Sequence, residues 1–161
     1  MQSSGRQANR LAVRCGGLDD EQVHELLQAH LAGMHENSPP ESVFALDLSG
    51  LRSPDITFYS AWDGSQLAGI GALKELSPQW GEIKSMRTHA RHLKKGVASL
   101  LLEQLLAEAR SRSYRRLSLE TGKGPSFEAA LSLYAKYGFE AGSEFADYEP
   151  SEFSQYLHLD L

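Results

Sequence analysis

Cysteine is almost absent from this sequence of 161 residues, and long apolar runs are missing. The single cysteine, Cys15, excludes an internal disulfide and any zinc cluster built from cysteines. No segment approaches the roughly 18 apolar residues of a membrane-spanning helix, and the first residues lack the apolar stretch of a signal peptide. We therefore expect a cytoplasmic protein that has no metal site and in which Cys15 is a small packed residue.

The sequence does contain enough apolar residues for a core, together with an uneven distribution of charge. Hydrophobic residues make up 41% of the chain, the formal net charge is −5, and the length suits one domain over residues 1–161. Residues 87–116 carry eight basic and two acidic side chains, whereas residues 140–161 carry six acidic and no basic ones. Binding to nucleic-acid backbones usually needs a broad basic face. We therefore expect no nucleic-acid partner, although the basic segment suits one small polyanion.

Hydrophobic periodicity predicts alternating strands and helices without internal repeats. Helices are expected after the capping residues Asp19 and Asp20, after Gly96, and from a Ser126 cap through Tyr137. Pro39 and Pro40 should stop the first helix, because proline cannot continue its hydrogen-bond ladder. Residues 41–53 are ambiguous and fit a short helix. Strands are expected at residues 11–13, 56–62, 67–73, 80–88, 115–121 and 153–161, which gives a mixed α/β sheet with helices on both faces.

The segment before the second long helix carries the strongest chemical signal. A helix N-terminus offers unpaired backbone N–H groups and partial positive charge, which together bind phosphate. Gly96 and Ala98 leave room for a phosphate to approach the backbone, and Lys94 and Lys95 add positive charge. A purely structural alternative is that Gly96 only opens a helix and the lysines are solvated. The chain contains no Walker A loop and no dinucleotide-binding fingerprint.

Two stretches in order along the chain resemble the GNAT superfamily of N-acetyltransferases, and the resemblance spans residues 10–161. The first runs from Leu93 through Gly96 to Ala98 and is similar to the family signature [Q/R]-x-x-G-x-[G/A] at the start of the long helix. It departs from that signature at Leu93, where glutamine or arginine is usual. The second stretch, residues 130–139, is similar to the A-x-x-L-Y-x-K-x-G-F helix and strand of the family.

The resemblance implies a single-domain, GNAT-like α/β fold with a mixed, mostly antiparallel sheet and helices on both faces. It implies that acetyl-coenzyme A is the co-substrate and that its pantetheine arm lies where the third strand of the meander diverges from the strand after the long helix. Main-chain groups of that third strand would contact pantetheine, and the loop before the long helix would hold the pyrophosphate. The implied coenzyme-binding residues are Met86, Arg87, Thr88, Leu93, Lys94, Lys95, Gly96, Val97, Ala98, Ser99 and Thr121.

The reaction requires a proton acceptor and a proton donor. An amine with a pKa of about 10 is protonated at neutral pH, so a base or a water relay must remove a proton before the nitrogen attacks. Tyr134 matches the usual proton donor of the family to the leaving thiolate, and the alternative is a packed amphipathic tyrosine. Glu82 resembles the glutamate base of the histone acetyltransferase branch, and the alternative is a residue that only orients a neighbour or orders water. His89 and His92 are secondary candidates for the base, and because they lie in the basic loop beside the phosphate end we expect them to be solvated instead.

The acceptor side is the least determined part of the prediction. The resemblance implies that the first helix, the meander and the connection before the last strand build it. Carboxylates and aromatic rings there would favour a cationic amine, and an acidic solvated loop is the alternative. The residues in question are His30, His35, Glu36, Tyr59 and Trp62 on one side and Phe145, Asp147, Tyr148 and Phe153 on the other.

The sequence therefore predicts an acetyl-CoA-dependent N-acetyltransferase, similar to a bacterial branch of small acetyltransferases, that modifies a primary amine of a small molecule in a ternary complex. Alternatives are a non-catalytic acyl-CoA-binding regulatory domain, which would need neither Glu82 nor Tyr134, and a protein or peptide N-acetyltransferase. A nucleic-acid-binding module is disfavoured by the net charge and by the lack of aromatics among the basic residues. We expect no membrane partner, and a homodimer stays open as the oligomeric state.

Overall fold

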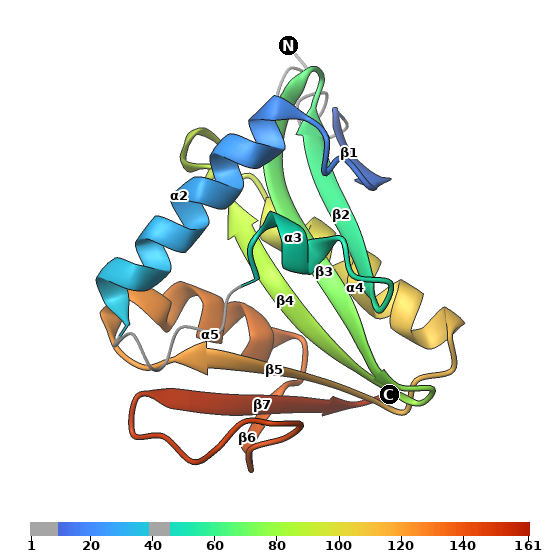
Figure 1. The fold of residues 1–161 in the computed structure, drawn as a ribbon, viewed down its shortest axis with the longest axis vertical. Coiled ribbons are helices and arrows are strands. Elements are labelled where there is room, and N and C mark those ends of the chain that lie inside the picture. The colour runs from blue at the N-terminus through green and yellow to red at the C-terminus, as the bar shows by residue number, and fades with distance from the viewer. Residues whose placement is uncertain (1–9, 39–45) are drawn as a thin grey trace.

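A seven-stranded sheet organises residues 10–38 and 46–161, the parts of the chain that the computed structural model describes (Figure 1). The strand order is β1-β2-β3-β4-β5-β7-β6. Strands β4 and β5 run parallel, and the other neighbouring pairs run antiparallel. The strands span Leu11–Cys15 (β1), Ile56–Asp63 (β2), Gln66–Ser77 (β3), Trp80–Thr88 (β4), Arg116–Gly122 (β5), Glu140–Gly142 (β6) and Ser154–Asp160 (β7).

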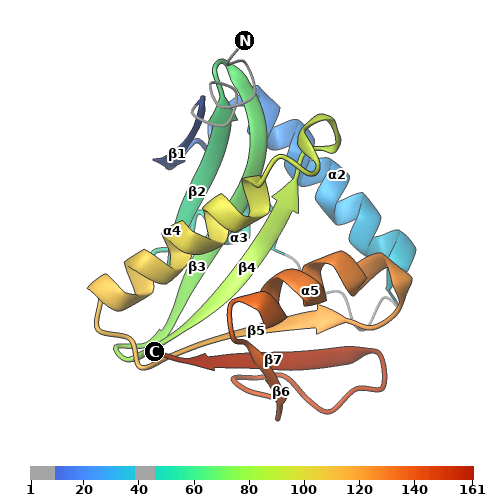
Figure 2. The ribbon, with the colours of Figure 1, turned by 180° about the vertical axis from the view of Figure 1, so that it is seen from behind.

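Helices cover both faces of the sheet, which confirms the predicted arrangement. One face carries α2 (Glu21–Asn37) and the short α3 (Leu48–Leu51), and the other carries α4 (Val97–Ser111) and α5 (Glu128–Lys136), as Figure 2 shows. Two 3₁₀ turns, Ala90–His92 and Pro125–Phe127, precede α4 and α5. None of the helices in the described parts of the chain is long and apolar enough to cross a membrane.

The limits of α2 follow from its sequence. Asp20 caps the helix, because its side chain accepts a hydrogen bond from the backbone N–H of Gln22 at 2.8 Å. The apolar side chains recur at helical spacing and are buried against β2 and β3. The helix ends at Asn37. Pro39 and Pro40, the predicted stop, lie outside the described residues, as does the first part of the ambiguous segment 41–53, whose later part contains α3.

The core on the other face is built around α4. Val97, Leu101 and Leu105 of this helix pack against the sheet together with Leu117 and Leu119 of β5, and all five are buried. The spacing of the leucines matches the helical period. The core therefore fixes the direction of α4, and with it the position of the glycine-containing turn at its start.

Truncating Leu105 tests this core. Leu105 has no exposed surface, so Leu105→Ala is expected to lower the free energy of unfolding by about 2–5 kcal/mol, the range for a large-to-small change that leaves a cavity. Leu93→Ala is the matched control, because Leu93 is 58% exposed and the same truncation there should change stability by less than about 0.5 kcal/mol. Urea unfolding measures both, and equal effects would contradict the assignment of α4 to the core.

The parallel pairing of β4 with β5 is short. It covers three residue pairs, from Trp80–Arg116 to Glu82–Ser118, although β4 continues to Thr88 and β5 to Gly122. Beyond these pairs the two strands diverge, as both ribbon views show (Figures 1 and 2). This is the separation of strands that the family resemblance implied.

Several local predictions were wrong. Ser126 does not cap the last helix, because its hydroxyl donates a hydrogen bond to the side-chain oxygen of Asn37 at 2.9 Å and α5 begins at Glu128 without a side-chain cap. Strand β6 was not predicted, because three residues are too few to show a period. Cys15 is exposed rather than packed, because β1 lies at the edge of the sheet.

Candidate active site

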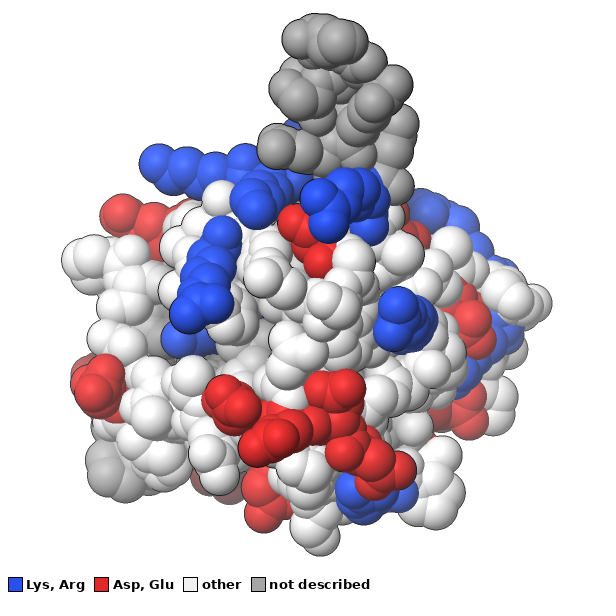
Figure 3. All heavy atoms as spheres, turned by 90° about the horizontal axis from the view of Figure 1, so that it is seen from above, with Lys and Arg blue, Asp and Glu red and all other residues white. Residues whose placement is uncertain are grey.

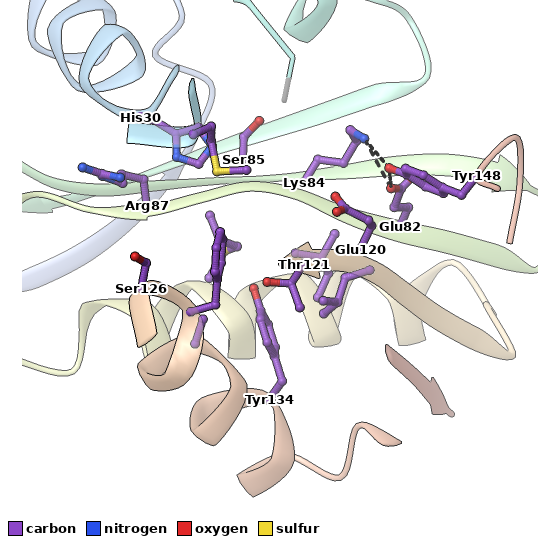
Figure 4. Close-up of a pocket in the computed structure, with 16 residues that line it drawn as sticks. His30, Glu82, Lys84, Ser85, Arg87, Glu120, Thr121, Ser126, Tyr134 and Tyr148 are labelled. Carbon is purple, nitrogen blue, oxygen red and sulfur yellow. Dashed lines mark hydrogen bonds and ion pairs between the residues drawn. The ribbon is translucent and has the colours of Figure 1, made fainter. Parts of the chain in front are cut away.

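A cavity of about 210 Å³ lies where β4 and β5 diverge. Both strands contribute to its walls, together with α2, α5 and the segment before β7 (Figure 4). Five of the residues predicted for the site line this cavity: Glu82, Met86, Arg87, Thr121 and Tyr134. The topology therefore brings together both proposed catalytic residues and part of the proposed coenzyme site.

An irregularity in β4 shapes the cavity wall. Ile70 pairs with Arg87 and Ala72 pairs with Lys84, so two residues of β4 face the single residue Gly71 of β3. Ser85, at this bulge, has a φ of 58°, in the left-handed region that few residues other than glycine adopt. A bulge disrupts the ladder and leaves backbone groups unpaired. The main chain of β4 at this point is thus free to contact a ligand.

Glu82 is held in a network of hydrogen bonds at one end of the cavity. It is 2% exposed, and its Oε2 accepts a 2.6 Å hydrogen bond from the Tyr148 hydroxyl. The Nζ of Lys84 donates to the same oxygen at 3.3 Å and to the Tyr148 hydroxyl at 3.0 Å. The pKa of Tyr148 is raised by burial and by the Glu82 charge, so its hydroxyl stays protonated at neutral pH. This network fixes the orientation of the Glu82 carboxylate.

A second carboxylate, Glu120, faces the same cavity and was not predicted. Glu82 pairs with Ser118, and Glu120 lies two residues further along β5, where the two strands diverge. Its pKa is raised mainly by burial. The alternation of side chains along a strand could have identified Glu120. Leu117 and Leu119 face one side of the sheet, so Ser118 and Glu120 face the other.

Tyr134 approaches the cavity from α5. Its ring is buried and packs against Phe139 with the ring centroids 5.5 Å apart, and its hydroxyl points into the cavity beside Thr121 (Figure 4). Burial raises the pKa of Tyr134, because a low-dielectric environment disfavours the phenolate. The Tyr134 hydroxyl is thus protonated and can donate a hydrogen bond to a group in the cavity.

The start of α4 has the geometry of an anion site. Lys94 and Gly96 both adopt left-handed backbone angles, with φ of 64° and 84°, and turn the chain into the helix. Gly96 is the N-cap of this 15-residue helix and has no side chain that could satisfy the first backbone N–H groups. These donors and the helix dipole are available to a phosphate.

The start of α4 also lies next to the end of β4. A Cβ atom added to Gly69 would lie 2.7 Å from Cγ1 of Val97 and 3.0 Å from the carbonyl oxygen of Arg87, so the lack of a side chain at Gly69 permits this contact. The two parts of the predicted coenzyme site, residues 86–88 and 93–99, are therefore neighbours in space. Leu93, Lys94, Lys95 and Gly96 are exposed at this place.

Two side chains of this loop are not where the sequence suggested. His92 is buried instead of solvated, and its Nδ1 lies 3.8 Å from Oδ2 of Asp63. Lys95 turns the same way, with its Nζ 3.3 Å from Nδ1 of His92 and 3.9 Å from Oδ2 of Asp63. Burial and the Lys95 charge lower the pKa of His92, which favours its neutral form. The Lys95 ammonium thus lies near His92 and Asp63, although the side chain is still 48% exposed.

The predicted acceptor residues separate into two sets. His30 and Tyr148 line the cavity, and Phe145 packs on the Tyr148 ring with the centroids 5.0 Å apart. Tyr59 and Trp62 do not reach the cavity, because they are buried in the two cores on either side of β2, so their assignment was wrong. The remaining residues, His35, Glu36, Asp147 and Phe153, are not part of the cavity lining.

The face seen in Figure 3, which looks onto the top of Figure 1, carries charges of both signs. A group of Asp and Glu side chains lies together near its middle, and most of the Lys and Arg side chains lie on the other part of that face, where some acidic side chains also occur. Among residues 10–38 and 46–161, no three His, Cys, Asp or Glu side chains gather closely enough to hold a metal ion.

Comparisons with known proteins agree with this geometry. A sequence model of the Acetyltransferase (GNAT) family matches residues 21–139. The uncharacterized N-acetyltransferase YsnE of Bacillus subtilis is 54% identical over 84% of this chain and 90% of its own. The uncharacterized N-acetyltransferase YedL of Escherichia coli is 49% identical over 92% of this chain and 94% of its own.

Solved structures show the same fold. A putative acyl-CoA N-acyltransferase from Klebsiella pneumoniae superposes with a TM-score of 0.76 at 24% identity, covering 94% of this chain and 97% of the other. A GNAT family acetyltransferase from Elizabethkingia anophelis, solved with acetyl-CoA bound, superposes with a TM-score of 0.69 at 17% identity, covering 95% and 99%.

The fold and the family match define the class of this protein, which is an N-acetyltransferase. The chain belongs to the GNAT family of acetyltransferases.

Proposed function

We propose that residues 1–161 form one acetyltransferase domain that transfers the acetyl group of acetyl-CoA to a primary amine of a small molecule. The acceptor amine attacks the thioester directly, in a complex that holds both substrates. The observation that carries this proposal is the cavity between the diverging strands, which holds two carboxylates and a buried tyrosine beside an uncapped helix N-terminus. The acetyl-CoA bound to the Elizabethkingia structure of the same fold supports the choice of coenzyme.

The coenzyme would be held by two neighbouring segments. The backbone donors of residues 94–99 and the dipole of α4 suit the pyrophosphate, with Lys94 adding positive charge. The exposed Leu93 supplies no polar side chain there, so the backbone carries the contact. Main-chain groups of Met86, Arg87 and Thr88 and the hydroxyl of Thr121 would contact the pantetheine and thioester. Acetyl-CoA then brings its acetyl group to the level of the cavity.

The proposed chemistry uses one residue from each wall of the cavity. Glu82 accepts a proton from the amine, directly or through water, because the hydrogen bonds from Tyr148 and Lys84 keep its carboxylate in place. The neutral amine nitrogen then forms a bond to the acetyl carbon, the bond from this carbon to sulfur breaks, and the nitrogen loses a second proton, which balances the proton that the sulfur gains. Tyr134 donates a hydrogen bond or a proton to the leaving sulfur, for which its protonated state is required.

The size of the cavity favours a small acceptor. Its volume of about 210 Å³ is below the range of roughly 300–1,000 Å³ that is usual for pockets of drug-sized ligands. The acetyl end of the coenzyme must share this space. A compact primary amine fits such a volume better than a folded protein surface does.

Coenzyme binding is tested by thermal unfolding. Acetyl-CoA is expected to raise the melting temperature in a dose-dependent way, by an amount that corresponds to about 2.7 kcal/mol at a concentration of 100 Kd. Ala98→Asp should abolish this shift, because a carboxylate in the first turn of α4 repels the pyrophosphate. The same carboxylate favours the helix dipole, so the free variant should remain folded.

The matched control is Ala107→Asp, which makes the same change at an exposed position of α4, away from its N-terminus. This variant should keep the shift in melting temperature. Absence of any shift with the unmodified protein at millimolar acetyl-CoA would overturn the proposal.

A further inference from the structure

Two buried polar groups at one end of the cavity have no partner. Nδ1 of His30 and Oγ of Ser85 make no hydrogen bond with the described residues, although each residue is only 8% exposed. Both residues line the cavity (Figure 4). Buried polar atoms are nearly always hydrogen-bonded, so two such atoms on residues that line one cavity call for a partner that the described residues do not supply.

The guanidinium of Arg87 lies at the same end. A Cβ atom added to Gly33 would be 3.1 Å from Nη1 of Arg87, so the guanidinium packs against α2 one turn beyond His30. Arg87 makes no ion pair or hydrogen bond with residues 10–38 or 46–161. An arginine in the wall of a cavity without a carboxylate partner is a binding group for an external anion.

The charge state of His30 fits the same ligand. Burial and the neighbouring Arg87 charge lower the pKa of His30 to about 4, so the ring is neutral at neutral pH. A neutral imidazole that carries its proton on Nδ1 can donate one hydrogen bond, and the neighbouring guanidinium offers two in a planar fork. Ser85 is not counted among these donors, because its hydroxyl points away from the Arg87 guanidinium (Figure 4). These donors match a carboxylate.

The position of Arg87 indicates that the anion it binds belongs to the acceptor and not to the coenzyme. Its guanidinium lies on the α2 face of the sheet, whereas the start of α4, the proposed phosphate site, lies on the opposite face. On the α2 side, the other end of the cavity carries Glu82 and Glu120, which suit an amine. The cavity thus has an end for an anion and an end for an amine.

We propose that His30 and Arg87 form a carboxylate subsite, so that the acceptor is an amine that also carries a carboxylate, as an amino acid does. This inference rests on the proposed function and names the class of its acceptor. The carboxylate binds between α2 and the bulge of β4, and the amino group points toward Glu82 and Glu120. The main chain of Arg87 keeps its proposed contact with the coenzyme, while its side chain binds the carboxylate of the acceptor.

Pairs of amines that differ only in a carboxylate test the subsite. The pairs are β-alanine with ethylamine, γ-aminobutyrate with propylamine, and phenylalanine with phenylethylamine, compared at equal concentrations of free amine in a thiol-release assay with acetyl-CoA. In at least one pair, the carboxylated member is expected to have a kcat/KM higher by about tenfold to a hundredfold, as for hydrogen bonds to a charged group. Equal rates within every pair would overturn the inference and leave the proposed function in place.

Two variants assign the preference to this site. Arg87→Gln should reduce the ratio within the preferred pair to about threefold or less, because it removes the charge from the subsite. Arg110→Gln is the matched control, since Arg110 is exposed near the far end of α4, and it should keep the ratio. A variant Arg87→Gln that weakens the acetyl-CoA shift in melting temperature but keeps the ratio would assign the guanidinium to the coenzyme and overturn the inference.

A binding measurement separates this inference from the proposed function. Titration with the carboxylated member of each pair should shift the NMR resonances of the His30 ring, whereas the matched amine should leave them unchanged. If no amine releases thiol but this shift is seen, the proposed reaction fails and the carboxylate subsite stands. If thiol is released but neither the shift nor the preference is seen, only the subsite is rejected.

Discussion

Replacing Glu82 by glutamine is expected to lower kcat for acetyl transfer by about 10²- to 10⁴-fold, the contribution typical of a positioned general base. Glutamine keeps an oxygen that can accept the hydrogen bond of the Tyr148 hydroxyl, so the packing around the side chain should survive. It loses the ability to take a proton from the amine. Steady-state thiol release measures kcat, and the shift of melting temperature with acetyl-CoA confirms that the variant still binds coenzyme.

Two further variants test whether the loss of kcat is specific to the Glu82 carboxylate. Tyr148→Phe removes the 2.6 Å hydrogen bond to Glu82 but leaves the carboxylate, so its effect on kcat should be smaller than that of Glu82→Gln. Glu120→Gln neutralises the second carboxylate of the cavity and should act mainly on KM for the amine. A loss of kcat that is larger for Glu120→Gln than for Glu82→Gln would transfer the role of base to Glu120.

The pH dependence adds a second criterion. Because burial raises the pKa of Glu120, this group becomes protonated at a higher pH than an ordinary glutamate does. If its charge attracts the amine, KM should increase as the pH falls through that raised pKa. The Glu120→Gln variant should no longer show this increase of KM at low pH, whereas the Tyr148→Phe variant should still show it.

Replacing Tyr134 by phenylalanine is expected to lower kcat by about 10²-fold, the lower end of the range for a general acid, with little change in coenzyme affinity. The hydroxyl points into the cavity, whereas the ring packs on Phe139, and phenylalanine preserves this packing (Figure 4). The variant should therefore fold normally and release the thiol slowly.

Tyr137→Phe is the matched control for Tyr134→Phe. Tyr137 follows the end of the same helix, and its hydroxyl donates to a carboxylate oxygen of Glu103 at 2.6 Å without lining the cavity. Removing that hydroxyl should leave kcat unchanged. Full activity in Tyr134→Phe would return Tyr134 to a packing role, and equal losses in both variants would point to a general effect on α5.

The parts that the sequence predicted well depend on local patterns. The leucines of α4 repeat with the helical period, and Gly96 stands where a left-handed turn must open that helix. The second resemblance motif placed Tyr134 on the last helix, the strand pattern of residues 80–88 placed Glu82 on the third strand of the meander, and the structure puts both in one cavity. Such features need only neighbouring residues to be recognised.

The parts that were missed depend on contacts between distant residues. Ser126 has the residue type of a helix cap, yet its hydroxyl bonds Asn37, 89 positions away in the chain. His92 lies in a basic loop, but it is buried beside Asp63 at the end of β2, 29 positions earlier in the chain. Glu120 becomes a site residue because β5 runs beside β4 for three pairs and then diverges. No local period encodes these contacts.

The short pairing of β4 with β5 implies that a coenzyme bound as proposed would also stabilise the sheet. The sheet consists of two half-sheets, β1 to β4 and β5 to β7, joined by three residue pairs. Past Glu82 and Ser118, the facing edges present backbone N–H and C=O groups that no strand of the other half-sheet satisfies. The amide groups of a pantetheine arm lying there would pair with those edges as an added strand does. The ligand would then complete the sheet and stiffen the two halves against each other.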